Sequence, residues 1–176
     1  MKAKHFFLTG LPFVGKTTAL LRSLQLLDRA EGFVTQAVEL NGKRIGLNII
    51  NSHQQIFKFA SLNLNSAHRS GKYSVDIAAL NTAIGEVFDN RGKAKYIYID
   101  EIGTLFCQSP FFIDKVSSLL ESHTLIGVIA KKGHSFVQEI HRRPDCCFTE
   151  VTADNRDDMP NTIMKKITGN EYFEES

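Results

Sequence analysis

One short stretch near the start of the chain limits its fold more than any other feature. It has the spacing G-x-x-x-x-G-K-[ST], with an apolar run before it and a run of helical periodicity after it. Its glycines let successive backbone N–H groups face one anion, and the following helix directs its positive dipole end to the same point. This order predicts a phosphate-binding loop between a strand and a helix. The loop and the threonine after it consist of Gly10, Leu11, Pro12, Phe13, Val14, Gly15, Lys16, Thr17 and Thr18.

Two side chains of this loop have predicted roles, and a third is unusual. Lys16 is expected to reach the β- and γ-phosphates of a nucleotide, and the Thr17 hydroxyl is expected to hold Mg²⁺. Phe13 stands where many such loops have a further glycine. A bulky side chain at that place is expected to narrow or reshape the phosphate-binding nest.

A second informative stretch is the apolar run from Tyr96 to Ile99, which ends in the two acids Asp100 and Glu101. This pattern is typical of the strand that carries the second Mg²⁺-linked carboxylate of a phosphate-loop NTPase. Asp100, at the carboxyl end of the strand, is expected to hold the metal through a water molecule. Glu101 is expected beside the γ-phosphate, where a carboxylate can orient or deprotonate an attacking water.

Apolar strands alternate with helical segments along the whole chain. This alternation predicts an α/β phosphate-loop NTPase fold, with a mostly parallel, doubly wound sheet flanked by helices, as a single domain over residues 1–176. Asn41-Gly42 predicts a β-hairpin, expected at an edge or as an insertion because it fits poorly inside a parallel sheet. The predicted helices cover 17–28, 77–90, 110–121, 134–141 and 160–167, and the predicted strands cover 6–8, 33–40, 44–50, 56–59, 96–101, 124–130 and 147–152.

Composition gives no support to several classes of partner. The 21 Lys and Arg residues nearly balance the 19 Asp and Glu residues, so no large field favours nucleic acid or an anionic membrane. No apolar run approaches the roughly 18 residues that indicate a membrane span. Cys107, Cys146 and Cys147 lack the spacing of metal ligands, which suits a reduced, cytoplasmic protein.

Five linked motifs span almost the whole chain: Gly10 to Thr18, Gly32-Phe33-Val34-Thr35, Gly71-Lys72-Tyr73-Ser74-Val75, Asp100-Glu101-Ile102-Gly103 and Val151 to Asp157. In their order and spacing they resemble the motifs of the THEP-type nucleoside triphosphatases. The resemblance implies slow hydrolysis of several nucleoside triphosphates, namely ATP, GTP, CTP and UTP, to the diphosphate and phosphate. It also implies Mg²⁺ as cofactor and a RecA-like α/β core.

The chain also departs from this family pattern at several positions. The residues Lys16, Thr17, Asp100 and Glu101 are retained, so the minimal chemistry of a triphosphatase is present. The departures are Phe13 for a usual glycine, Gln36, Ala37 and Glu39 for charged residues after the Gly-Phe pair, Phe106 for an acid, and Asn81 for a frequent glutamate.

Two further segments have alternative interpretations. Asn155 and Arg156 begin a run that resembles the Asn-Lys-x-Asp base-recognition element of GTPases, and the alternative is a capped turn. Arg142 and Arg143 follow a predicted helix and could act as an intrinsic arginine finger on the γ-phosphate, or lie in a solvated loop.

Two other functions remain open from the sequence. A nucleoside or nucleotide kinase uses the same loop, but it needs a second substrate site and usually an arginine-rich lid, which only Arg142 and Arg143 suggest. A nucleotide-binding module that does not hydrolyse its ligand is favoured by Phe13 and by the lost charges.

Overall fold

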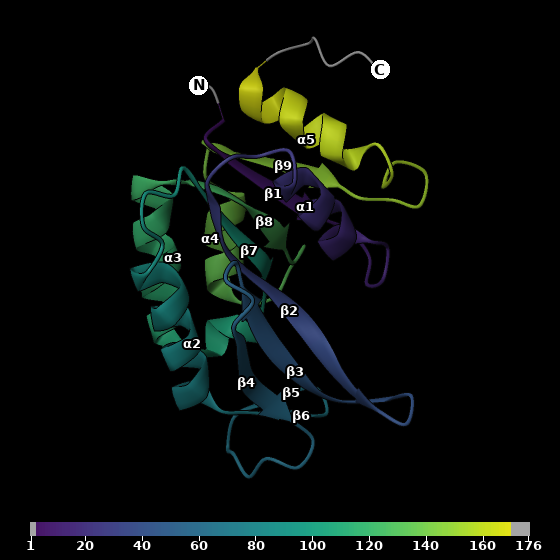
Figure 1. The fold of residues 1–176 in the computed structure, drawn as a ribbon, viewed down its shortest axis with the longest axis vertical. Coiled ribbons are helices and arrows are strands. Elements are labelled where there is room, and N and C mark those ends of the chain that lie inside the picture. Colours follow the sequence, from purple (N-terminus) through teal and green to yellow (C-terminus); the bar gives the residue numbers. More distant parts are fainter. Residues whose placement is uncertain (1–2, 170–176) are drawn as a thin grey trace.

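The computed structural model describes residues 3–169 and contains one nine-stranded sheet (Figure 1). The strand order is β5-β6-β4-β3-β2-β7-β8-β1-β9. The five strands from β2 to β9 in this order are parallel, which confirms the predicted α/β core. They are β2 (Ala30–Leu40), β7 (Tyr96–Ile102), β8 (Thr124–Ile129), β1 (His5–Thr9) and β9 (Cys146–Glu150).

The other part of the sheet is antiparallel. Asn41 and Gly42, with φ of 50° and 72°, form the predicted turn between β2 and β3. The hairpin lies beside the parallel strands, but it is not at an edge of the whole sheet because further strands continue beyond it. The antiparallel strands after β2 are β3 (Lys43–Asn51), β4 (Ile56–Ser61), β5 (Arg69–Ser70) and β6 (Tyr73–Val75). The last two are too short for a periodic signal, so the sequence did not predict them.

One boundary differs from the prediction for a clear steric reason. The first helix was predicted to run to residue 28 and the next strand to begin at residue 33, whereas α1 ends at Leu24 and β2 begins at Ala30, so that Gly32 lies inside β2. A Cβ at Gly32 would come within 1.9 Å of the Tyr98 carbonyl oxygen of the neighbouring strand. Glycine therefore allows β2 and β7 to approach, rather than marking the end of a helix.

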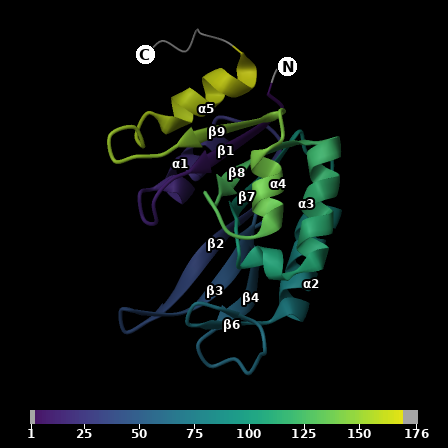
Figure 2. The same cartoon turned by 180° about the vertical axis from the view of Figure 1, so that it is seen from behind.

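Helices cover both faces of the parallel strands (Figure 2). Neighbouring residues of one strand enter different cores, as Phe7 packs on the side of α2, α3 and α4 while Leu8 packs on the side of α1 and α5. The helices are α1 (Lys16–Leu24), α2 (Ile77–Asp89), α3 (Pro110–Ser122), α4 (Ser135–His141) and α5 (Met159–Thr168), and a short 3₁₀ turn, η1, spans Phe106–Gln108.

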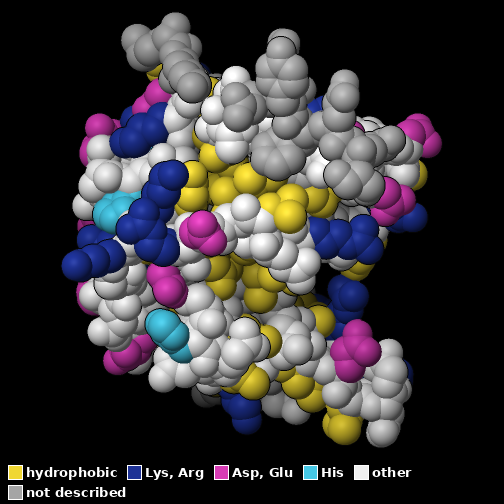
Figure 3. Space-filling model, turned by 45° about the horizontal axis from the view of Figure 1, so that its top comes forward, with side chains coloured by type: hydrophobic (Ala, Val, Ile, Leu, Met, Phe, Trp, Pro, Cys, Tyr) yellow, Lys and Arg dark blue, Asp and Glu magenta, His cyan; other side chains and the backbone are white. Residues whose placement is uncertain are grey.

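No helix within residues 3–169 is long and apolar enough to cross a membrane. On the face shown in Figure 3, basic and acidic side chains both surround the exposed hydrophobic ones. The net charge of +2 is therefore not concentrated on that face as a field of one sign.

Candidate functional site

The predicted phosphate loop lies at the carboxyl ends of the parallel strands. It connects Thr9, the last residue of β1, to Lys16, the first residue of α1. Gly10 has a φ of 141°, and a Cβ there would lie 2.5 Å from the Val151 carbonyl oxygen. Gly15 caps α1 with a φ of 106°. Both glycines are therefore required by the backbone, as the loop motif predicts.

A cleft of about 770 Å³ opens over this loop. It brings together most of the predicted phosphate and metal residues, which come from the loop after β1, from α1 and from β7. Its wall also includes residues that the sequence did not single out as site residues, from the β2–β3 hairpin and from the segment after β8. The lining residues are Gly10, Leu11, Pro12, Phe13, Gly15, Lys16, Thr17, Thr18, Thr35, Ala37, Arg44, Leu47, Asp100, Glu101, Val128, Ile129, Ala130, Lys131 and Lys132.

The Lys16 ammonium folds over the loop. Its Nζ atom donates to the carbonyl oxygens of Leu11 at 2.7 Å and Gly10 at 3.1 Å. Both acceptors are neutral, and a phosphate oxygen is a stronger acceptor for an ammonium group. The geometry therefore gives Lys16 partners that an incoming polyphosphate can replace.

Asp100 is buried and holds the loop and two strands together. Its carboxylate accepts from Thr17 Oγ1 at 2.9 Å and from the Thr35 backbone N–H at 3.1 Å. Thr35 Oγ1 also donates to the Asp100 carbonyl oxygen at 3.2 Å. Burial raises the pKa of Asp100 to about 6, and these hydrogen bonds offset only part of that cost. Thr35 was not predicted as a site residue, although the Gly-Phe-Val-Thr motif contains it.

The donor set around Asp100 suits Mg²⁺. The Thr17 hydroxyl and the Asp100 carboxylate are hard oxygen ligands, and they lie in hydrogen-bond contact at the floor of the cleft. Within the described range, no three His, Cys, Asp or Glu side chains gather into a metal-binding group. Mg²⁺ commonly takes one or two protein ligands and completes its shell with water and phosphate, so the residues fit this ion.

Glu101 has a strained backbone. Its φ is 80°, a conformation that residues with a side chain rarely adopt, and the β7–β8 register shifts between Ile99 and Ile102. The side chain is exposed and lines the cleft beside Asp100. Such irregular strand ends redirect a side chain, and strained residues gather at functional sites. The conformation sets Glu101 at the opening of the cleft while Asp100 stays buried.

Phe13 also has a left-handed backbone, with a φ of 63°. Its ring is 84% exposed and lines the cleft, with the guanidinium carbon of Arg44 5.1 Å from the ring centroid. The loop therefore keeps the backbone conformation of the usual glycine while it carries a large side chain. The expectation that Phe13 narrows the nest stays a prediction.

The two candidate base-contact residues lie after β9 and differ in their contacts. The Asn155 side chain accepts from the Thr152 N–H at 2.8 Å and donates to the Glu150 carbonyl oxygen at 2.9 Å, as in a capped turn. The Arg156 side chain lies against the phosphate loop, since a Cβ at Gly15 would be 3.5 Å from its Cδ atom. Contact of either residue with a nucleotide base stays a prediction.

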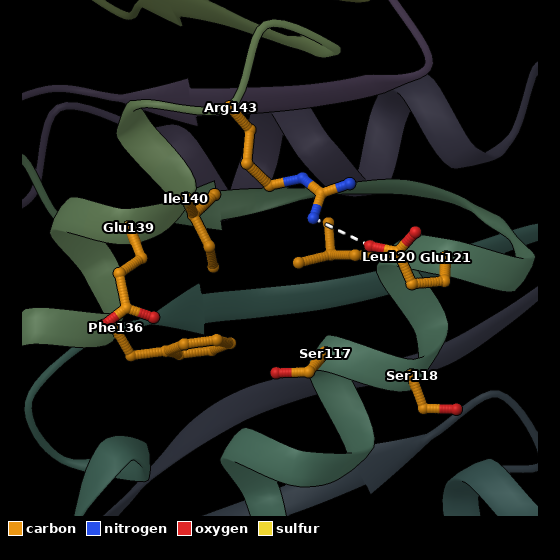
Figure 4. Close-up of a pocket in the computed structure, with 8 residues that line it drawn as sticks. All are labelled: Ser117, Ser118, Leu120, Glu121, Phe136, Glu139, Ile140 and Arg143. Carbon is orange, nitrogen blue, oxygen red and sulfur yellow. Dashed lines mark hydrogen bonds and ion pairs between the residues drawn. The ribbon is translucent and has the colours of Figure 1, made fainter.

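The interpretation of Arg142 and Arg143 as arginine fingers is wrong. Both precede β9, and the pairing of Cys146 with His5 puts the start of β9 at the amino end of β1, opposite the phosphate loop. Arg143 donates to both oxygens of Asp145, at 3.0 and 2.8 Å, and to Glu121 at 2.8 Å. It lines a separate cavity of about 410 Å³ between α3 and α4 (Figure 4). The only suggestion of an arginine-rich lid is thereby removed.

Other departures from the family pattern have structural roles. Phe106 is fully buried, and its ring centroid lies 5.3 Å from that of Phe33 and 5.3 Å from that of Phe112. Asn81 accepts from Ser109 Oγ at 2.5 Å at the start of α3. Phe106 packs in the core and Asn81 makes a hydrogen bond at the start of α3, and neither is among the residues that line the cleft.

A model of a protein family described as NTPase matches residues 5–164. Nucleoside-triphosphatase THEP1 of Natranaerobius thermophilus is 32% identical over 173 residues, which cover 95% of this chain and 98% of that protein. The similarity therefore extends over the phosphate loop, the acidic strand and the segment after β9.

Two solved structures are also similar to the whole chain. The solution structure of a human cancer-related nucleoside triphosphatase has a TM-score of 0.81 at 28% identity, covering 96% of this chain and 100% of that chain. The crystal structure of THEP1 from the hyperthermophile Aquifex aeolicus has a TM-score of 0.73 at 31% identity, covering 90% and 96%.

Proposed function

The chain belongs to the NTPase family, and we propose that its cleft hydrolyses nucleoside triphosphates to the diphosphate and phosphate. One observation carries this proposal. The buried Asp100 accepts from Thr17 of the phosphate loop, and the next residue, Glu101, is held in a strained conformation at the opening of the same cleft. The residues proposed to bind phosphate, to hold the metal and to act on water therefore line one cleft.

We propose that Thr17 and Asp100 hold Mg²⁺, Thr17 directly and Asp100 through a water molecule. The ion supplies positive charge that screens the phosphate oxygens. A cation beside Asp100 also favours its ionised form, against the burial that raises the pKa of this carboxyl to about 6. The backbone of residues 10–15 and the Lys16 ammonium bind the β- and γ-phosphates, in place of the carbonyl oxygens that Lys16 now contacts.

Glu101 is the proposed group that acts on the water. Its carboxylate orients a water molecule in line with the γ-phosphorus and accepts a proton from it as the bond to the leaving oxygen breaks. Most of the catalysis in phosphoryl transfer comes from positioning and charge stabilisation. A slow reaction is consistent with a site in which one carboxylate has this role.

The proposed substrates are ATP, GTP, CTP and UTP, because the roles proposed for the cleft residues concern the phosphates rather than a particular base. Arg156, which lies against Gly15, and Asn155 are the proposed base-side residues.

Cys107, Cys146 and Cys147 are all free thiols, which supports a reducing, cytoplasmic environment.

Phosphate release with four nucleoside triphosphates, with and without Mg²⁺, tests the proposal. We expect release from several of the four, and loss of release when EDTA removes the metal. Nucleosides and nucleoside monophosphates are then added as acceptors. A protein that transfers phosphate only to an acceptor is a kinase, and one that binds triphosphate but never releases phosphate is a binding module. Either result would replace the triphosphatase proposal.

A further inference from the structure

The β2–β3 hairpin brings an arginine to the phosphate loop. Arg44 is the second residue of β3, just after the turn at Asn41 and Gly42. It lines the same cleft as Lys16, Asp100 and Glu101. A basic side chain that is distant along the sequence therefore reaches the site at which triphosphate is expected.

The backbone of Arg44 is fixed, but its side chain is only weakly held. Its carbonyl oxygen accepts from Lys72 Nζ at 3.0 Å, and β3 lies between β2 and β4. Its guanidinium contacts Glu39 at 3.4 Å, and the two side chains are 48% and 54% exposed. Exposed ion pairs of this kind are weak, so a phosphate oxygen can take the place of Glu39 at little cost.

Phe13 supplies the surface on which this guanidinium rests. The Arg44 guanidinium carbon lies 5.1 Å from the centroid of the Phe13 ring, within the range of a cation–π contact. Phe13 has a φ of 63°, where glycine is favoured, and its ring is 84% exposed. The contact gives a reason for a strained aromatic residue in a loop that usually has glycine at this place.

The direction from which Arg44 enters indicates which part of the nucleotide it meets. In the sheet, β3 and β2 lie on the side of β7, which carries Asp100 and Glu101. Arg156 follows β9, on the other side of β1, where the base is expected. Arg44 therefore approaches the reacting γ-phosphate end of the cleft rather than the base end.

We propose that Arg44 is an intrinsic arginine that contacts the γ-phosphate and stabilises charge in the transition state, with Phe13 as its positioning residue. The inference rests on the proposed triphosphatase function. Phosphoryl transfer spreads negative charge over the equatorial oxygens, and a planar guanidinium can donate to two of them at once. No atom is transferred to or from Arg44, which acts only through charge and hydrogen bonds.

The test compares Arg44→Ala, Arg44→Lys and Arg44→Gln with the matched control Arg69→Ala, which alters an exposed arginine on β5 that does not line the cleft. We expect Arg44→Ala and Arg44→Gln to lower kcat for Mg-ATP by roughly 10- to 1,000-fold, with a smaller loss for Arg44→Lys. The affinity for ADP with aluminium fluoride, which resembles the transferring phosphoryl group, should fall by a similar factor. The affinity for ADP alone should stay within about twofold of wild type, and thermal melting should show that each variant is folded.

Phe13→Leu keeps an apolar side chain but removes the aromatic face. It should lower kcat less than Arg44→Ala does, and the double variant should lose no more than Arg44→Ala alone, because both changes act on one contact.

Three results would overturn the proposal. The first is an unchanged kcat and an unchanged affinity for ADP with aluminium fluoride in the Arg44→Ala and Arg44→Gln variants. The second is a loss of affinity for ADP alone as large as the loss for ADP with aluminium fluoride, which would indicate a ground-state or base contact, and the third is fully additive effects of Phe13→Leu and Arg44→Ala on kcat. The proposed function has a separate failure. If wild type binds ADP with aluminium fluoride but releases no phosphate, the triphosphatase proposal fails, while the comparison of wild type and Arg44→Ala in that binding assay still decides the role of Arg44.

Discussion

The parallel strands have their amino ends on one side of the sheet and their carboxyl ends on the other, and we call these two sides the amino edge and the carboxyl edge. Similar charged groups have different partners at the two edges. At the amino edge, Arg143 binds both oxygens of Asp145 and also Glu121, so each charge has a charged partner. At the carboxyl edge, Asp100 is buried with only hydroxyl and N–H donors, and Lys16 contacts only carbonyl oxygens. Burial raises the pKa of Asp100 to about 6, whereas the Arg143 guanidinium holds the pKa of Asp145 at about 2.

This contrast separates charges that stabilise the fold from charges that are available to a ligand. A carboxylate in a bidentate pair with arginine gains stability in the folded state. A buried carboxylate without a cationic partner costs stability that binding of a cation can recover. The predictions below test whether this division is correct.

The largest effect is expected from Glu101→Gln, which keeps size and hydrogen bonding but removes the charge. We expect turnover to fall by about 10² to 10⁴, with the affinity for Mg-ATP nearly unchanged, because the carboxylate acts on the water rather than on the bound nucleotide. Stopped-flow measurement of phosphate release and titration of ATP check both values. A matched control is Glu86→Gln, since Glu86 is exposed on α2 and is not among the residues that line the cleft. Equal losses in both variants would remove Glu101 from its proposed role.

Lys16→Ala should weaken triphosphate binding by about one to two decades. The variant loses a charge-assisted contact worth roughly 1.5 to 3 kcal/mol, while in the unliganded protein it loses only hydrogen bonds to two loop carbonyls. Calorimetric titration with ATP and GTP measures the affinity, and urea unfolding measures the stability. A variant that binds both nucleotides like wild type would show that the loop is not the phosphate site.

The amino edge should give the protein a pH dependence of stability through His5. Burial lowers the pKa of His5 from 6.5 to about 4, so the unfolded chain binds more protons between these values and stability falls as the pH falls. We expect His5 to contribute a loss of about 2 kcal/mol between pH 7 and pH 5, whereas the raised pKa of Asp100 changes stability in the opposite direction over this range. The His5 contribution is therefore measured by urea unfolding as the difference between wild type and His5→Gln, a variant that keeps an acceptor for the Leu125 N–H. Identical slopes would mean that other groups set the dependence.

The smallest effects, and the most direct comparison of the edges, come from replacing one aspartate at each. Asp145→Asn should lower the free energy of unfolding by about 1 kcal/mol, because it breaks the pair with Arg143. Asp100→Asn should raise it by about 1 kcal/mol at pH 8 without Mg²⁺ or nucleotide, because the raised pKa means that the ionised carboxylate costs stability above about pH 6. Changes of the same sign in urea unfolding would contradict the division between the two edges.

The sequence by itself determined the phosphate loop, the acidic strand and the order of most helices and strands. These features depend on local properties. Gly10 and Gly15 are needed at positive φ, Asn41-Gly42 suits a tight turn, and Asp76 caps α2 by accepting from the Ala79 N–H at 2.9 Å. A residue pattern reports such requirements because the interacting groups lie within a few positions of one another.

Only the tertiary structure decided which charges are paired and which line the cleft. The sequence around Arg143 and Arg44 does not show which of the two arginines lies near the phosphate loop. Strand pairing places Arg143 at the amino edge and Arg44 beside the phosphate loop. Thr35 lies far from Asp100 along the chain, and it reaches the carboxylate because β2 pairs with β7. These contacts depend on the order and register of the strands, which are fixed by packing over the whole sheet and not by any short stretch of residues.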